Sequence, residues 1–168
     1  MLRRIPILAT TLLFPGLLAA QELMDRPIAF PGAEGYGRYA VGGRGGRVCI
    51  VSNLDDRGVG SFREAAGMKE PRIILFSVSG TIHLESPLTI VGPVTIAGQS
   101  APGDGICIAD HPVRLRGDQI VIRYLRFRLG DRHQAGQGKV PGSGGDDALG
   151  GTGNRHLVID HCSLSWST

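Results

Sequence analysis

The sequence predicts an all-β protein built as a parallel β-helix, a solenoid in which each turn of the chain adds short strands to stacked sheets. Three observations support this fold class. From Pro71 onward, short β-rich runs follow one another closely without intervening helical patterns. Three of these runs resemble one another at intervals typical of a structural repeat. Glycine, which favours tight turns, accounts for 26 of the 168 residues.

The β-rich runs are separated by turns that contain glycine or proline. Each run is rich in valine, isoleucine and leucine, which suits a strand that buries one side. The runs cover residues 72–78, 81–84, 88–91, 94–97, 106–109, 113–116, 120–129 and 157–166.

The repeat is visible in the segments PVTIAG (93–98), QIVIRY (119–124) and HLVIDH (156–161), which share an apolar-x-apolar centre. They begin 26 and 37 residues apart, so the second interval contains an extra loop of roughly eleven residues. Repeats of about 20–30 residues are typical of solenoids. No LxxLxLxxN pattern of a leucine-rich repeat is present. A β-sandwich stays open as an alternative, because only three copies are visible.

A short helix is expected over GSFREAAG (60–67), ahead of the first repeat. Ser61 is a favourable N-cap, Glu64 falls at the capping-box position, and Phe62, Ala65 and Ala66 give the helix an apolar side. Because the first turn of a solenoid needs a cover, we expect this helix to be the N-terminal cap. The preceding residues 29–58 are expected to form turns around one or two short strands, including RVCIVSNL (47–54).

Residues 1–20 have the pattern of a secretory signal peptide, with Arg3 and Arg4 before an apolar stretch and Ala19–Ala20 near the cleavage point. A membrane anchor is the alternative. The mature domain is expected to span 21–168, to be secreted and to have no membrane contact after cleavage. Its net charge is only about +1, and its basic residues are interspersed with acidic ones rather than gathered in a long run. The sequence therefore shows no basic region of the kind that binds nucleic acid.

The cysteines and the glycine clusters carry no clear ligand pattern. Cys49, Cys107 and Cys162 lie in apolar runs and are expected to be small buried hydrophobic residues rather than metal ligands. The clusters GGRGGR (42–47) and GSGGDDALGG (142–151) match neither GxxxxGK[ST] nor GxGxxG after a strand, which argues against nucleotide binding.

The adjacent acids Asp146 and Asp147, set among glycines, are the main candidates for chemistry. They could solvate a turn, act as paired carboxylates in glycoside hydrolysis, or bind Ca²⁺, which prefers several oxygen ligands. Asp160 and His161 are expected to satisfy backbone groups at the end of a run, and their side chains diverge if the strand is regular. Trp166 fits either packing or sugar stacking.

Several blocks of the sequence stand out together, in this order: AFPGAEGYGRYAVGGRGG, VSNLDDRGVGSFREA, PRIILFSVSGTIHL, LTIVGPVTIAGQSAPGDGI, VIRYLRFRLGD, DDALGG and VIDHCSLSWS. Together they closely resemble the pectate lyases of polysaccharide lyase family 1. The resemblance spans roughly Ile28 to Thr168. It implies a secreted right-handed parallel β-helix that cleaves de-esterified pectin (polygalacturonate) by Ca²⁺-dependent β-elimination.

The resemblance also implies roles for individual residues. Asp147 matches a family Ca²⁺ ligand, and Asp146 is a second candidate because Gly145 stands where the family often has another aspartate. Asp160 and His161 match the Asp-His signature, which implies structural support beside the cleft. The family's catalytic arginine lies downstream of Thr168, so the catalytic base is unknown here, and Arg123, Arg126 and Arg128 come too early to be it.

These correspondences predict that the chain is the N-terminal part of a pectate lyase and is C-terminally incomplete. We expect it to have little activity alone. The full-length protein is expected to be a monomer. Two alternatives stay open. A polygalacturonase-type glycoside hydrolase also uses paired aspartates on a β-helix, although no Gly-His-Gly tripeptide is present. A non-catalytic carbohydrate-binding β-helix would retain the polymer unchanged.

Overall fold

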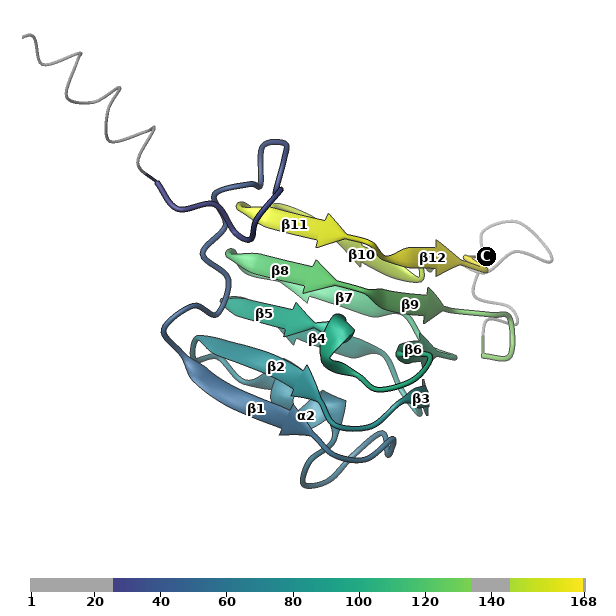
Figure 1. The fold of residues 1–168 in the computed structure, drawn as a ribbon. Coiled ribbons are helices and arrows are strands. Elements are labelled where there is room, and N and C mark those ends of the chain that lie inside the picture. The colour runs from purple at the N-terminus through teal and green to yellow at the C-terminus, as the bar shows by residue number, and fades with distance from the viewer. Residues whose placement is uncertain (1–25, 134–145, 168) are drawn as a thin grey trace, which may run out of the picture.

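The computed structural model describes residues 26–133 and 146–167, which form stacked parallel strands with one short α-helix and one 3-10 helix, η1 (Gly98–Ser100) (Figure 1). The expected signal peptide, residues 1–20, lies outside the described residues. Within those residues, none of the helices is long and apolar enough to cross a bilayer. The strands assemble into three sheets, here called A, B and C.

Sheet A has the order β1-β2-β5-β8-β11, sheet B the order β12-β9-β6-β3, and sheet C the order β10-β7-β4. Sheet A contains β1 (Arg47–Val51), β2 (Arg72–Phe76), β5 (Val94–Ala97), β8 (Ile120–Arg123) and β11 (Leu157–Asp160). Sheet B contains β3 (Gly80–His83), β6 (Ile106–Ala109), β9 (Leu125–Arg128) and β12 (Ser163–Ser165). Sheet C contains β4 (Leu88–Val91), β7 (Val113–Arg116) and β10 (Leu149–Gly151).

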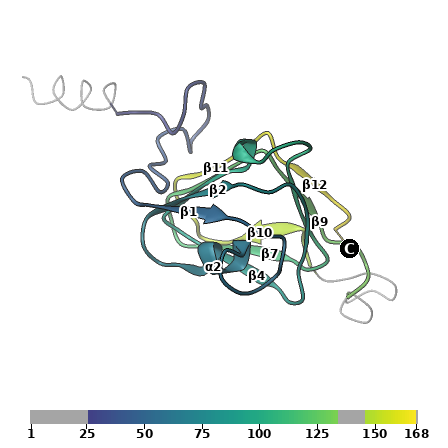
Figure 2. The ribbon, with the colours of Figure 1, turned by 60° about the horizontal axis from the view of Figure 1, so that its bottom comes forward.

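Every pairing within the three sheets is parallel, and successive turns of the chain add one strand to each sheet in turn. Figure 2 shows the three sheets around a common interior. The repeats found in the sequence are neighbours in sheet A, where Val94 pairs with Ile120 and Ile120 with Leu157. The fold is therefore the right-handed parallel β-helix that the sequence predicted, and the β-sandwich alternative is wrong.

The structure divides each of the two longest predicted runs, 120–129 and 157–166, into two strands on different sheets. Tyr124 separates β8 from β9 with a φ of 57°, and His161 follows β11 with a φ of 51°. This left-handed conformation turns the chain from sheet A to sheet B. It is uncommon for residues other than glycine, which is why the residue types did not reveal the corner.

The core consists of aliphatic side chains stacked in register from one turn to the next. On sheet A, Ile74, Ile96 and Ile122 are fully buried, and on sheet B Ile82 and Ile108 are equally inaccessible. Burial of each such side chain contributes about 1.5–3 kcal/mol, so these stacks are the main source of cohesion between turns.

The predicted N-terminal cap is present as α2 (Phe62–Gly67), which covers the interior at the first turn (Figure 2). Ser61 Oγ accepts a hydrogen bond from the backbone N–H of Glu64 at 3.2 Å, and Glu64 Oε2 accepts one from the N–H of Gly60 at 2.9 Å. Phe62, Ala65 and Ala66 are buried against the core, as their spacing predicted.

Arg72, at the start of β2, is fully buried and fixes the end of this helix. Its Nε donates to the carbonyl of Ala65 at 2.7 Å and its Nη2 to the carbonyl of Ala66, while Nη1 donates to the carbonyl of Pro93 at 3.1 Å. Burial lowers the pKa of the Arg72 guanidinium from its ordinary value. A single side chain thus links the cap to the next turn.

Residues 35–46 run past the amino-terminal ends of the sheet A strands, from β11 back to β1 (Figure 1), and this path explains their glycines. A Cβ on Gly37 would lie 2.0 Å from the carbonyl oxygen of Leu157, and one on Gly43 would lie 1.7 Å from that of Arg72. Only glycine permits such backbone approach. Gly42, Gly43 and Gly46 of the GGRGGR cluster therefore pack against strands.

The cysteines only partly follow the prediction of buried hydrophobic residues. All three are free, but only Cys49 is buried. Cys162 is half-buried, and burial raises the pKa of its thiol. Cys107 is half-buried and lines a groove on the outside of sheet B, so for this residue the prediction of burial is wrong.

Candidate functional site

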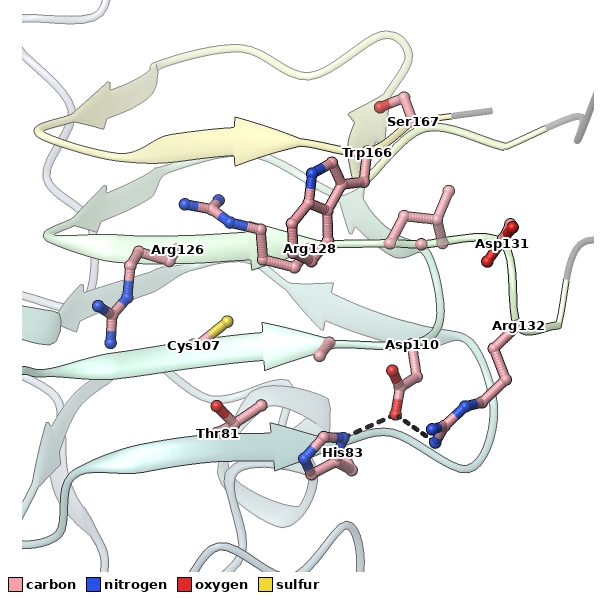
Figure 3. Close-up of a pocket in the computed structure, with 13 residues that line it drawn as sticks. Thr81, His83, Cys107, Asp110, Arg126, Arg128, Asp131, Arg132, Trp166 and Ser167 are labelled. Atoms are coloured by element: carbon pink, nitrogen blue, oxygen red, sulfur yellow. Dashed lines mark hydrogen bonds and ion pairs between the residues drawn. The ribbon is translucent and has the colours of Figure 1, made fainter.

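A groove of about 770 Å³ lies on the outer face of sheet B and is here called the sheet B groove (Figure 3). Its walls come from β3, β6, β9, the turn after β9 and the residues after β12. The lining residues are Thr81, His83, Cys107, Ala109, Asp110, Arg126, Arg128, Leu129, Gly130, Asp131, Arg132, Trp166 and Ser167.

Strand register places the outward side chains of the sheet B groove in two columns, since alternate residues of a strand share a face. The first column is Thr81, Cys107, Arg126 and Ser163, and the second is His83, Ala109, Arg128 and Ser165. Successive members of a column lie on strands about 4.8 Å apart. Both arginines are on β9, and their neighbours in the columns are mostly short.

Asp110 organises one end of the groove. Its Oδ2 lies 2.8 Å from His83 Nδ1 and 3.8 Å from Arg132 Nη1, so the carboxylate has a cationic or hydrogen-bonding partner on two sides (Figure 3). Asp110 also has a φ of 80°, a strained conformation that for residues other than glycine is concentrated at functional sites. Sequence analysis missed His83 and Asp110, because their proximity follows only from the register of β3 and β6.

The two arginines on β9 differ in their contacts. Arg128 Nη1 donates to the carbonyl of Ser163 at 2.8 Å and Nη2 donates to Ser163 Oγ at 2.9 Å. Arg126 is half-buried and makes no hydrogen bond or ion pair within residues 26–133 and 146–167. The exposed ring of Trp166, with 67% of the residue accessible, lies 5.9 Å from the guanidinium carbon of Arg128.

Asp146 and Asp147 lie outside the sheet B groove, beside a smaller pocket of about 290 Å³ formed with β7 and β10. Asp146 Oδ1 accepts a bond from Arg114 Nη2 at 3.1 Å, whereas Asp147 is exposed. The next residue, Ala148, donates its N–H to Ser167 Oγ at 3.1 Å. This bond holds the acidic segment close to the end of β12, next to Ser167 of the groove.

This arrangement does not by itself form a calcium site. Ca²⁺ takes six to eight oxygen ligands at ~2.3–2.6 Å. Within the part of the chain that the structure describes, His, Cys, Asp and Glu side chains nowhere gather in groups of three or more that could hold a metal. Asp147 is available as a ligand, while Asp146 would have to release Arg114. The assignment of both residues to a metal therefore stays a prediction.

Asp160 and His161 form a cluster at the corner between sheets A and B, outside both pockets. Asp160 Oδ2 accepts a hydrogen bond from Arg123 Nε at 2.7 Å and lies 2.9 Å from His161 Nδ1. Burial would raise the pKa of Asp160, but the bonds from His161 and Arg123 outweigh it and lower the pKa. The two side chains meet rather than diverge, because β11 ends at Asp160 and His161 is left-handed.

Ring stacking extends this corner cluster. The Tyr124 and His161 rings stack with centroids 4.6 Å apart, and the Arg123 guanidinium lies 3.6 Å from the centroid of Phe30. The cluster therefore connects the N-terminal segment to two successive corners of the β-helix. Structural support beside the cleft, the role predicted for Asp160 and His161, stays a prediction.

Comparison with known proteins gives consistent relatives, although no family model matches the sequence. "Probable pectate lyase C" from Aspergillus flavus is 40% identical over 158 residues, covering 92% of this chain and 35% of that protein. The protein of the same name from Emericella nidulans is 42% identical over 140 residues, 83% of this chain and 31% of that one. "Putative pectate lyase 11" from Arabidopsis thaliana is 31% identical over 157 residues. The chain thus spans about a third of the length of these relatives.

Proposed function

This chain is a homologue of the pectate lyases over nearly its whole length. From that premise we propose that it belongs to a secreted lyase that cleaves de-esterified pectin by Ca²⁺-dependent β-elimination. The proposed substrate is polygalacturonate. In this proposal residues 1–20 direct secretion and are removed, and residues 21–168 supply early turns of the catalytic β-helix, acting as a monomer.

The sheet B groove is the observation that carries this proposal. It is open along several turns of the β-helix, so an extended polymer has room to lie across successive strands. Arg126 and Arg128 supply positive charge for the carboxylates of a uronate chain, and the exposed Trp166 supplies a flat surface for a sugar ring. A polymer with an acid on each sugar matches this combination.

Asp147 is proposed as one ligand of Ca²⁺. Its carboxylate is exposed and lies on a segment bonded to Ser167 at the edge of the groove. The described residues supply too few oxygen atoms to hold the ion alone, so the other ligands belong to solvent, the substrate carboxylate or further protein groups. Asp146 is proposed as an additional ligand only if it gives up its bond to Arg114.

In the proposed reaction a base removes the proton from C5 of a galacturonate unit, and the electron pair forms the C4–C5 double bond as the C4–O bond breaks. The leaving sugar oxygen takes up a proton, so no water is consumed. Neither Arg123 nor Arg128 is proposed as the base. Arg123 is paired with Asp160, Arg128 is bonded to Ser163, and a base needs a free group beside the reacting carbon.

The metal role of Asp147 is tested with protein expressed from the complete gene. Polygalacturonate is incubated with wild type, Asp147→Asn and Asp104→Asn, and unsaturated uronate is followed by its ultraviolet absorbance. Asp104 is an exposed acid that lines neither pocket and serves as the matched control.

We expect Asp147→Asn to raise the Ca²⁺ concentration for half-maximal rate by about tenfold or more, since a neutral amide replaces a charged ligand. Asp104→Asn is expected to match wild type. An Asp147→Asn protein with an unchanged Ca²⁺ requirement would remove this residue from the proposed site.

A further inference from the structure

We propose that Arg126 is a specificity-determining residue that binds one free carboxylate of the polymer in the sheet B groove, without a metal ion. The identity of the sugar, galacturonate, rests on the proposed function. The carboxylate chemistry rests on Arg126 itself and on the residues around it.

The position of Arg126 gives its guanidinium access to a ligand. It faces outward from β9, between Ser163 on one neighbouring strand and Cys107 on the other, with Thr81 one strand further along the same column. These neighbours are short, so the space above them stays open. In Figure 3 the Arg126 side chain extends along the groove toward the level of Cys107.

The charges nearby leave Arg126 without an internal counterion. The groove acids Asp110 and Asp131 lie beyond the carboxyl ends of the strands, away from Arg126 (Figure 3). Asp110 is already matched by His83 and Arg132. A half-buried guanidinium whose five donors lack protein partners among the described residues favours an anionic ligand that satisfies them.

The same guanidinium distinguishes an acid from its ester. A planar fork of N–H donors binds a carboxylate through two parallel charge-assisted bonds, whereas a methyl ester offers a neutral and weaker acceptor. Arg128, two residues along β9 and about 6.7 Å away along the strand, adds positive charge on the same face. Arg126 therefore favours de-esterified units over methylated ones.

The test measures binding of trigalacturonate and of its methyl ester to the 168-residue chain by calorimetry, in EGTA so that no metal contributes. The variants are Arg126→Gln, Arg126→Lys and the control Arg116→Gln. Arg116 is an exposed, outward-facing arginine on β7 of sheet C, outside both pockets. Thermal unfolding of each variant accompanies the titrations.

We expect wild type to bind the acid about tenfold more tightly than the ester, and Arg126→Gln to lose about tenfold in affinity for the acid but little for the ester. Arg126→Lys should fall between the two, since it keeps the charge and loses the fork. Arg116→Gln should match wild type. All unfolding midpoints should agree, because the Arg126 side chain makes no hydrogen bond or ion pair among the described residues.

Equal affinities of Arg126→Gln and Arg116→Gln for the acid would overturn the inference, as would wild type that fails to bind it in EGTA. These outcomes are separate from failure of the proposed function. If the acid binds through Arg126 but the protein from the complete gene forms no unsaturated product, the carboxylate site stands and the lyase proposal fails. If unsaturated product forms but Arg126→Gln binds the acid as tightly as wild type does, the lyase proposal stands and the carboxylate site at Arg126 fails.

Discussion

Replacement of Arg72 by methionine should destabilise the β-helix at its first turn. Methionine keeps much of the apolar stem of arginine but donates no hydrogen bonds. The substitution therefore removes the donors that now serve Ala65, Ala66 and Pro93 while leaving these backbone carbonyls in place. The end of α2 and the start of β5 lose the group that joins them.

The size of the effect follows from those carbonyls. The bonds to Ala65 and Ala66 are buried and the bond to Pro93 is partly buried. A buried acceptor left without a donor costs about 1–3 kcal/mol. Burial of the charged guanidinium is unfavourable, which is why it lowers the pKa of Arg72. The substitution removes this unfavourable burial, and that offsets part of the loss. The expected net destabilisation is about 3 kcal/mol.

Urea unfolding followed by circular dichroism measures this difference, and the same change at Arg47 provides the control. Arg47 pairs with Arg72 in the register of β1 and β2 but is exposed. Its replacement by methionine should alter the free energy of unfolding by no more than about 0.5 kcal/mol. Similar values for the two variants would show that the buried bonds contribute little and would refute this reasoning.

Other predictions concern the N-terminal segment, the corner cluster and the helix cap. Gly43→Ala should destabilise the fold by about 1–3 kcal/mol, because its Cβ would meet the Arg72 carbonyl at 1.7 Å, whereas Gly67→Ala, with open space around it, should be neutral or slightly stabilising in the same urea assay. Asp160→Asn should lower stability at neutral pH. Because the folded pKa of Asp160 is lowered, the advantage of wild type should persist above the ordinary aspartate value of about 3.9 and shrink as the pH falls below it; a pH-independent difference would contradict the charge argument. Ser61→Ala should cost about 1 kcal/mol through loss of the N-cap bond to Glu64, and unchanged unfolding would mean that the cap contributes nothing.

Much of the fold followed from the sequence, because stacked turns repeat the same physical demand. Each turn must place an apolar residue over the one below, so PVTIAG and QIVIRY have the same pattern and become adjacent strands. The helix cap was equally local, since Ser61 and Glu64 are three residues apart. Patterns confined to a few neighbouring residues were sufficient in both cases.

The groove could not be predicted in this way. His83 meets Asp110 only after β3 and β6 have paired, and Arg126 acquires its environment from Cys107 and Ser163 on other turns. The corner at Tyr124 was also hidden, because a tyrosine with positive φ follows from the path between two sheets rather than from its own preference. Contacts of this kind depend on which residues of distant segments pair in a sheet, so only the structure reveals them.

We propose that the protein cleaves polygalacturonate by elimination, and the mass of the products formed by protein from the complete gene tests this most directly. Elimination gives one fragment with an unsaturated end, lighter by one water than the fragment that hydrolysis gives, and we expect EGTA to abolish its formation. Saturated fragments that form equally in EGTA would identify a hydrolase instead. Polymer that is bound but uncut would identify a carbohydrate-binding protein, and either result would contradict the account.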